Sequence, residues 1–202
     1  GGQLGFLRER LPAIHPAPFH TLSQDSFLAE LARLEGDLPS LSPAKAVVRL
    51  STLVAAIGDA HTRLTLPIDA TADLFQGHSP APLPSDTAFR FHHYPVRFEW
   101  LADGLYASRV ASRDAWALGR RVIRFGDHPV DDALAKVAVI VEHDNEMGRR
   151  LLAPDRLVVA EILEALDLTQ HGVRLELWLA RESEAPKRLL VRPQAWGERV
   201  DW

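Results

Sequence analysis

The sequence predicts an α+β protein that begins with a three-helix unit and continues into a small, partly open β-barrel with two helices. In residues 1–66, apolar side chains recur at three- and four-residue steps, which is the spacing of amphipathic helices. In residues 94–193, apolar and polar side chains alternate in several short runs, which is the spacing of half-buried strands. Residues 67–93 are rich in proline, glycine and serine, and they predict an irregular linker or arm between the two domains.

Three helices are expected in residues 1–66. The first covers about Leu4 to Ile14. The second begins after Ser23, a preferred N-cap, and stops near Gly36. The third begins after Ser42, and Gly58 marks its end because glycine adopts the left-handed conformation at the lowest cost.

The second domain is expected to alternate between strands and helices. Two strands flank a tight turn at 102–104, a third strand closes at a Gly-Asp-His-Pro turn, and two helices precede a final hairpin. We expect strands at Val96–Leu101, Leu105–Val110, Arg121–Phe125, Val173–Ala180 and Lys187–Val191, a helix over 130–141, and a helix capped by Asp155 that runs through Leu166. Residues 142–154 are polar and are expected to form a solvated connection.

Composition excludes several classes of function. The 202 residues carry a net charge of -4 with acids and bases scattered, so neither nucleic acid nor an anionic membrane surface is an expected partner. The chain contains no cysteine, which rules out disulfides and thiolate zinc sites. No apolar run approaches the roughly 18 residues that span a bilayer, so no membrane span is expected.

Three polar side chains follow the third helix directly and form the strongest functional candidate. Asp59, His61 and Thr62 can donate, accept or shuttle protons from a loop at the end of a packed helix. The spacing leaves two interpretations open. Asp59 and His61 either carry chemistry, or they only close the turn and satisfy backbone groups.

The second domain resembles bacterial PDZ domains. The resemblance rests on Leu118–Val130, where a Leu-Gly turn enters a strand and a Gly-Asp-His-Pro-Val turn leaves it for a helix, and on the closing hairpin over 173–193. PDZ domains bind an extended peptide as an added strand, usually at its C-terminus. The resemblance implies that Gly104, Leu105 and Tyr106 line the peptide site, with a plain hairpin turn as the alternative interpretation of this segment.

A second resemblance covers nearly the whole chain. His15–Phe19 (His-Pro-Ala-Pro-Phe) and Leu53–Thr62 (ending Gly-Asp-Ala-His-Thr) resemble the N-terminal region of the C-terminal-processing, or tail-specific, serine peptidase family and its tricorn-type branch. The resemblance implies His61 as the general base and Asp59 as its orienting group; in the Ser/Lys branch the same residues are structural. Ala60 departs from the family's usual glycine, which would strain the loop if that position required a positive φ.

The resemblance implies the N-terminal helical and PDZ-like portion of a serine-type endopeptidase. We expect the tail, residues 194–202, to lead to a catalytic α/β domain beyond this chain, so the chain alone should be inactive. Expected partners are that downstream domain and a polypeptide substrate or peptide C-terminus. Periplasmic or secreted localisation is implied by the resemblance alone.

Two alternatives and one exclusion accompany this prediction. A non-catalytic PDZ-like peptide-binding adaptor is the alternative function. A metal site built from His92 and His93 with His128 or His143 is a weaker idea, because adjacent strand residues point to opposite faces. We therefore expect no metal and no cofactor.

Overall fold

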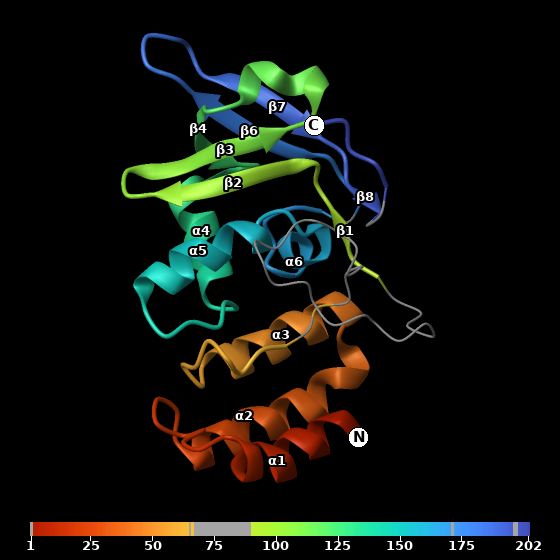
Figure 1. Ribbon diagram of the computed structural model, residues 1–202. Coiled ribbons are helices and arrows are strands. Elements are labelled where there is room, and N and C mark those ends of the chain that lie inside the picture. The colour runs from red at the N-terminus through yellow and green to blue at the C-terminus, as the bar shows by residue number, and fades with distance from the viewer. Residues whose placement is uncertain (1, 65, 67–89, 171, 196–197) are drawn as a thin grey trace. The chain divides into compact units, whose positions relative to one another are not determined.

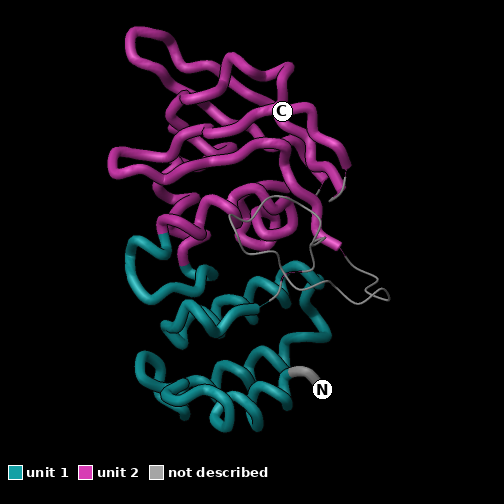
Figure 2. Tube along the Cα trace, viewed as in Figure 1, with its two compact units in different colours: residues 1–64, 139–149 teal, residues 65–138, 150–202 magenta. Residues whose placement is uncertain are grey.

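The computed structural model describes residues 2–64, 66, 90–170, 172–195 and 198–202, and it divides into two compact units. Unit 1 comprises residues 1–64 and 139–149, and unit 2 comprises residues 65–138 and 150–202 (Figure 2). Helices build unit 1, and antiparallel sheets with helices build unit 2, as the α+β prediction requires (Figure 1). Most of the predicted linker, residues 67–89, lies outside the described residues.

Unit 1 contains the three predicted helices. They are α1 (Gly2–Ile14), α2 (Gln24–Asp37) and α3 (Pro43–Ala55), with a short 3-10 turn, η1 (Leu38–Ser40), between the last two. The predicted N-caps are confirmed. The Ser23 hydroxyl accepts from the Ser26 amide at 3.2 Å, and the Ser42 hydroxyl accepts from the Lys45 amide at 3.3 Å.

One apolar cluster holds the three helices together. Its members come from all three and include Leu4, Leu11, Phe27, Leu31, Leu34, Leu53 and Ile57. Phe19, in the proline-rich loop after α1, packs against this cluster with its ring 5.8 Å from that of Phe27. Since burying each such side chain is worth about 1.5–3 kcal/mol, the cluster holds α3 against the other two helices.

The end of α3 is fixed by Gly58 and Thr21. Gly58 has a φ of +75°, the left-handed conformation predicted from the sequence. The Thr21 hydroxyl lies near the carbonyl oxygens of Ala56 and Ile57, at 2.7 and 2.6 Å, and so satisfies the last turn. A Cβ at position 58 would lie 2.7 Å from Thr21 Cγ2, so only glycine fits without movement.

Unit 2 is organised around an open antiparallel sheet. The strand order is β2-β3-β4-β6-β7, and β5 also pairs with β4. The strands are β2 (Val96–Leu101), β3 (Gly104–Val110), β4 (Arg121–Phe125), β5 (His128–Pro129), β6 (Leu175–Ala180) and β7 (Lys187–Val191). A separate pair joins β1 (His92–His93) to β8 (Gln194–Ala195). β2 and β7 therefore form the two edges of the main sheet.

The helices of unit 2 differ from the prediction in number and position. They are α4 (Val130–Ala138), α5 (Glu146–Arg156), whose residues 146–149 are assigned to unit 1, and α6 (Ala160–Ala165), and a 3-10 segment, η2 (Ser112–Ala117), follows β3. Asp155 lies inside α5 and caps nothing, so the predicted cap was wrong. α5 occupies a stretch predicted to be a polar connection, because its glycine, its internal proline and its charges conceal the helical period.

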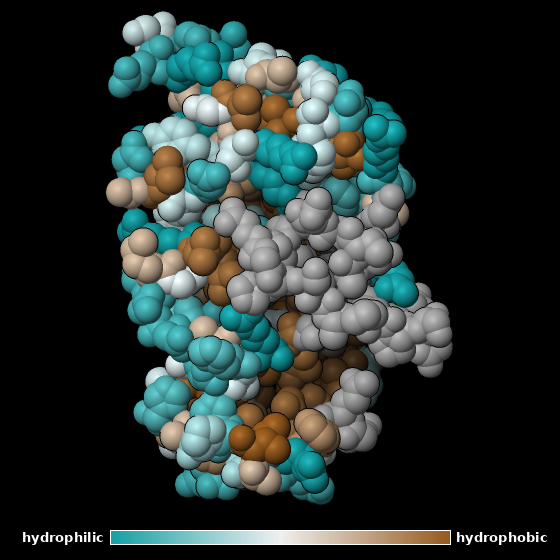
Figure 3. Space-filling model, viewed as in Figure 1, coloured by the Kyte–Doolittle hydropathy of each residue, from teal (hydrophilic) through white to brown (hydrophobic). Residues whose placement is uncertain are grey.

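The described residues contain no helix that is both long and apolar enough to cross a membrane. Among the coloured residues of Figure 3, hydrophilic side chains lie interspersed with apolar ones. This surface agrees with the scattered charges of the sequence.

Candidate functional site

The candidate site is the loop that follows Gly58 in unit 1. α3 ends at Ala55, and the left-handed Gly58 turns the chain after it, so Asp59, His61 and Thr62 lie together in the loop that the sequence predicts. The His61 side chain is 86% exposed, so its ring is open to solvent. Ala60 is not among the described non-glycine residues with a positive φ, so alanine fits here without the strain that the family's glycine suggested.

Asp59 is the centre of the loop because its carboxylate accepts four hydrogen bonds. The Thr62 hydroxyl donates to Oδ2 at 2.7 Å, and the His61 amide donates to Oδ1 at 2.9 Å. The His15 ring reaches Oδ2 at 2.8 Å, and His61 Nδ1 lies 3.3 Å from Oδ1. These hydrogen bonds, the one from Thr62 foremost, hold the pKa of Asp59 well below its ordinary value.

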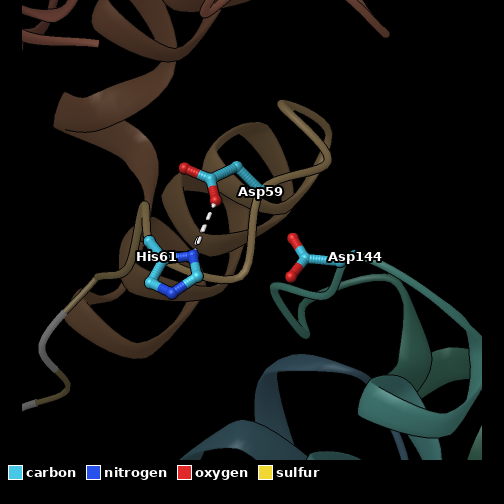
Figure 4. A group of neighbouring side chains, drawn as sticks. All are labelled: Asp59, His61 and Asp144. Carbon is cyan, nitrogen blue, oxygen red and sulfur yellow. Dashed lines mark hydrogen bonds and ion pairs between the residues drawn. The ribbon is translucent and has the colours of Figure 1, made fainter. Parts of the chain in front are cut away.

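The geometry at His61 suits a base. Its Nδ1 faces Asp59, and its Nε2 faces away from the carboxylate (Figure 4). A carboxylate accepts and never donates, so a hydrogen bond at this position places the ring proton on Nδ1. Nε2 then carries the lone pair that can take a proton from a partner outside the loop.

A second segment of unit 1, residues 139–149, supports this loop, and no pattern in the sequence predicts this role. Asp144 Oδ1 accepts from the Ala60 amide at 2.8 Å, and Glu142 Oε1 accepts from the Leu64 amide at 3.1 Å. Glu142 is only 2% exposed and so departs from the expected solvated connection, whereas Asp144 is exposed as expected. The contacts join residues about 80 positions apart, and no local pattern encodes such pairing.

Asp59, His61 and Asp144 form the one group among the described residues whose ligand atoms could converge on a metal, all within 4.8 Å of one another. Figure 4 shows the three side chains. Both Asp59 oxygens already accept two hydrogen bonds each, and Asp144 holds the Ala60 amide. A cation would compete with these hydrogen-bond donors for the carboxylate oxygens. The hydrogen bonds within the loop therefore already satisfy the groups that a metal would need.

The histidines of the weaker metal hypothesis do not form such a group within the described part of the chain. His92 is exposed and His93 is buried, as expected for neighbours on a strand. His92 Nδ1 pairs with Glu161 Oε1 at 2.7 Å instead.

The predicted peptide-site residues lie in an interior strand. Gly104, Leu105 and Tyr106 begin β3. Leu105 pairs with β2 on one side and β4 on the other, as does Tyr106, and Leu105 is 0% exposed. The backbone of Leu105 and Tyr106 is thus already occupied, and a peptide cannot add to it as a strand.

This order of elements, three helices followed by the open sheet of unit 2, has counterparts among solved structures. The fold is similar to that of CPAF. A structure of mature CPAF complexed with lactacystin matches 98% of this chain and 35% of that chain, with a TM-score of 0.63 and 15% identity. A serine-to-alanine CPAF mutant matches 95% of this chain and 33% of its own, with a TM-score of 0.61 and 15% identity. Mature CPAF gives a TM-score of 0.52 at 12% identity, covering 83% and 28% of the two chains.

CPAF is a chlamydial serine protease with a tail-specific-protease-like fold. The chain spans about a third of the length of CPAF, as the 35% and 33% coverages show. No family model and no curated protein matches the sequence. At 15% identity, the likeness to CPAF establishes the fold and leaves the activity to be argued from the site.

Proposed function

We propose that this chain is the N-terminal helical and PDZ-like portion of a serine-type endopeptidase that binds and cleaves polypeptides. The observation that carries the proposal is the exposed His61 ring, backed by a fully hydrogen-bonded Asp59, in a chain whose fold matches part of a serine protease. The nucleophilic serine and the oxyanion-binding amides belong, in this proposal, to a catalytic domain outside residues 1–202.

His61 performs the proton transfers in this mechanism. Its Nε2 removes the proton from the serine hydroxyl while the serine oxygen attacks the peptide carbonyl. Asp59 stabilises the imidazolium that forms, because it stays ionised throughout the neutral pH range. The imidazolium then returns the proton to the leaving amine, which completes acylation.

Replacing His61 in the full-length gene product tests this role. General-base catalysis contributes about 10² to 10⁴ in rate, so His61→Ala should lower kcat by at least about 100-fold on an unfolded protein substrate. His128→Ala is the matched control, because that ring bonds the Asp167 carbonyl oxygen in unit 2 and should leave kcat unchanged. Turnover by His61→Ala within about threefold of wild type would assign His61 a structural role.

Within unit 2, the free edge of β2 is a better candidate for peptide binding than Gly104, Leu105 and Tyr106 of β3. Among the described strands, β2 pairs only with β3, so its other edge can accept an added strand. Arg150 of α5 lies 5.4 Å from the Trp100 ring on β2, which places a helix beside this strand. Gly104, Leu105 and Tyr106 lie in β3, which pairs with the opposite side of β2, so they would not bind the peptide through their backbone.

The open β2 edge also fits the alternative function, a non-catalytic peptide-binding adaptor. The same full-length preparation separates the two functions. A peptidase hydrolyses the peptides that it binds, and His61→Ala binds them but turns them over at least about 100-fold more slowly. An adaptor binds the peptides and hydrolyses none of them, even as wild type.

A further inference from the structure

His15 is the least expected member of the site. It follows α1 directly, and its amide donates to the Leu11 carbonyl oxygen at 3.0 Å. Pro16 comes next and fixes the backbone that leads into Ala17. The His15 side chain is 11% exposed, whereas the nearby His20 lies on the surface. An imidazole that is largely shielded from water requires partners, and His15 has one for each ring nitrogen.

The partners of His15 determine its tautomer. The Ala17 amide donates to Nδ1 at 3.1 Å, so Nδ1 carries a lone pair and no proton. The single ring proton is therefore on Nε2, which donates to Asp59 Oδ2 at 2.8 Å. His15 bonded in this way is a neutral donor, and it leaves the negative charge of Asp59 intact.

His15 and His61 bind opposite oxygens of one carboxylate. His15 and Thr62 occupy Oδ2, which turns Oδ1 toward the amide and Nδ1 of His61. Fixing one oxygen limits rotation of the carboxylate about its last side-chain bond. The orientation of the His61 ring therefore depends on His15, which lies 44 positions before Asp59 in the sequence.

We propose that His15 is a positioning residue: through Asp59 it holds His61 in the Nδ1-protonated tautomer and keeps Nε2 free to accept a proton. This inference rests on the proposed function for its catalytic meaning. Its structural content, the control of one histidine's tautomer by another, stands independently of any activity.

Imidazole ¹⁵N NMR of the 202-residue chain tests the inference directly, because the shifts of Nδ1 and Nε2 report the tautomer ratio at each ring. His15→Phe keeps the ring volume and removes the donor. A net hydrogen bond of about 1 kcal/mol corresponds to about fivefold in population, so the Nδ1-H to Nε2-H ratio of His61 should fall by about that factor. His20→Phe makes the same substitution in the same loop and should leave the ratio unchanged.

A second variant keeps the test valid if His15→Phe disturbs folding. In His15→Gln, the side-chain amide nitrogen takes the place of Nε2 as a donor to Asp59, so His61 should keep the wild-type tautomer ratio. In the full-length protein, His15→Phe should lower kcat by about tenfold with little change in KM, and His15→Gln should restore most of it.

The outcomes separate the two proposals. An unchanged His61 tautomer in a folded His15→Phe variant overturns the positioning role, whatever the activity. An equal Nδ1-H to Nε2-H ratio of His61 in His15→Gln and His15→Phe overturns it too. A shifted tautomer combined with full activity of His61→Ala supports the positioning role and refutes the peptidase mechanism.

Discussion

The Asp59 carboxylate shows how far one residue's environment can depart from its sequence context. Its two oxygens accept hydrogen bonds from the His15 ring after α1, from the Thr62 hydroxyl and from the His61 backbone amide. An Asp after a glycine by itself indicates only a turn. The sequence singled out Asp59 and His61 as candidates, but it did not predict the hydrogen bonds that Asp59 accepts from His15 and Thr62. His15 belonged to a recognised motif, but no spacing rule predicts that two residues 44 positions apart share a hydrogen bond.

The depressed pKa of Asp59 predicts acid sensitivity. Its folded-state pKa lies below the unfolded value of about 3.9, so its stabilising effect is complete above that pH and declines as the pH falls. The free energy of unfolding should decrease more between pH 6 and pH 3 in wild type than in Asp59→Asn. Urea unfolding followed by tryptophan fluorescence measures this slope. Asp127→Asn, at an exposed turn, should keep the wild-type slope.

Gly58 predicts a second residue-level effect. Gly58→Ala forces a positive φ on alanine and brings its Cβ against Thr21, so it should destabilise the fold by about 1–3 kcal/mol. Gly36→Ala is the matched control. It lies inside α2 with open space around it, and it should stabilise by about 0.5–1 kcal/mol. Equal melting temperatures for both variants would contradict the requirement for glycine at 58.

At the scale of elements, the prediction was correct for strands in which apolar and polar side chains alternate regularly. β2, β4 and β7 begin and end at the predicted residues, since alternation marks a half-buried strand. α5 was missed because Gly148 and Pro154 interrupt it. Its Pro154 is buried within the fold, which shows that tertiary packing outweighs the low helix propensity of that segment.

Asp155, near the end of α5, predicts a pH effect of the opposite sign. Burial raises its pKa to about 6, although Arg156 and Arg97 oppose the shift. The folded state thus binds a proton more readily than the unfolded state, so stability is lost as the pH rises from about 4 to about 6, and the loss is complete above that pH. Asp155→Asn should raise the free energy of unfolding by about 2 kcal/mol at pH 7.5.

The advantage of Asp155→Asn should shrink as the pH falls from about 6 to about 4, because wild-type Asp155 is then neutral in the folded state. Thermal unfolding at pH 7.5 and pH 4 measures the difference. Asp127→Asn again serves as the control, as its side chain is exposed. A stability gain that is the same at both pH values would show that charge is not its cause.

At the scale of the whole molecule, the sequence indicated two domains but not how the chain is shared between them. Residues 139–149 belong to unit 1, where Glu142 and Asp144 bind the backbone of the candidate loop. The periodicity of side chains reflects only residues that are close in the sequence. A single sequence therefore does not indicate that residues 139–149 pack with unit 1. The likeness to CPAF over 98% of the chain supports the overall order of elements that the sequence predicted.

The pairing of β1 with β8 places His93 opposite Gln194 and His92 opposite Ala195. Residues 92–195 therefore start and finish as neighbours, a few ångströms apart at the Cα atoms. Proteins with adjoining ends accept circular permutation, and they can be inserted into a surface loop of an unrelated host with short linkers. The middle of this stretch, residues 139–149, belongs to unit 1, so a graft that carries its sheet edge into another scaffold would replace that segment with a short linker.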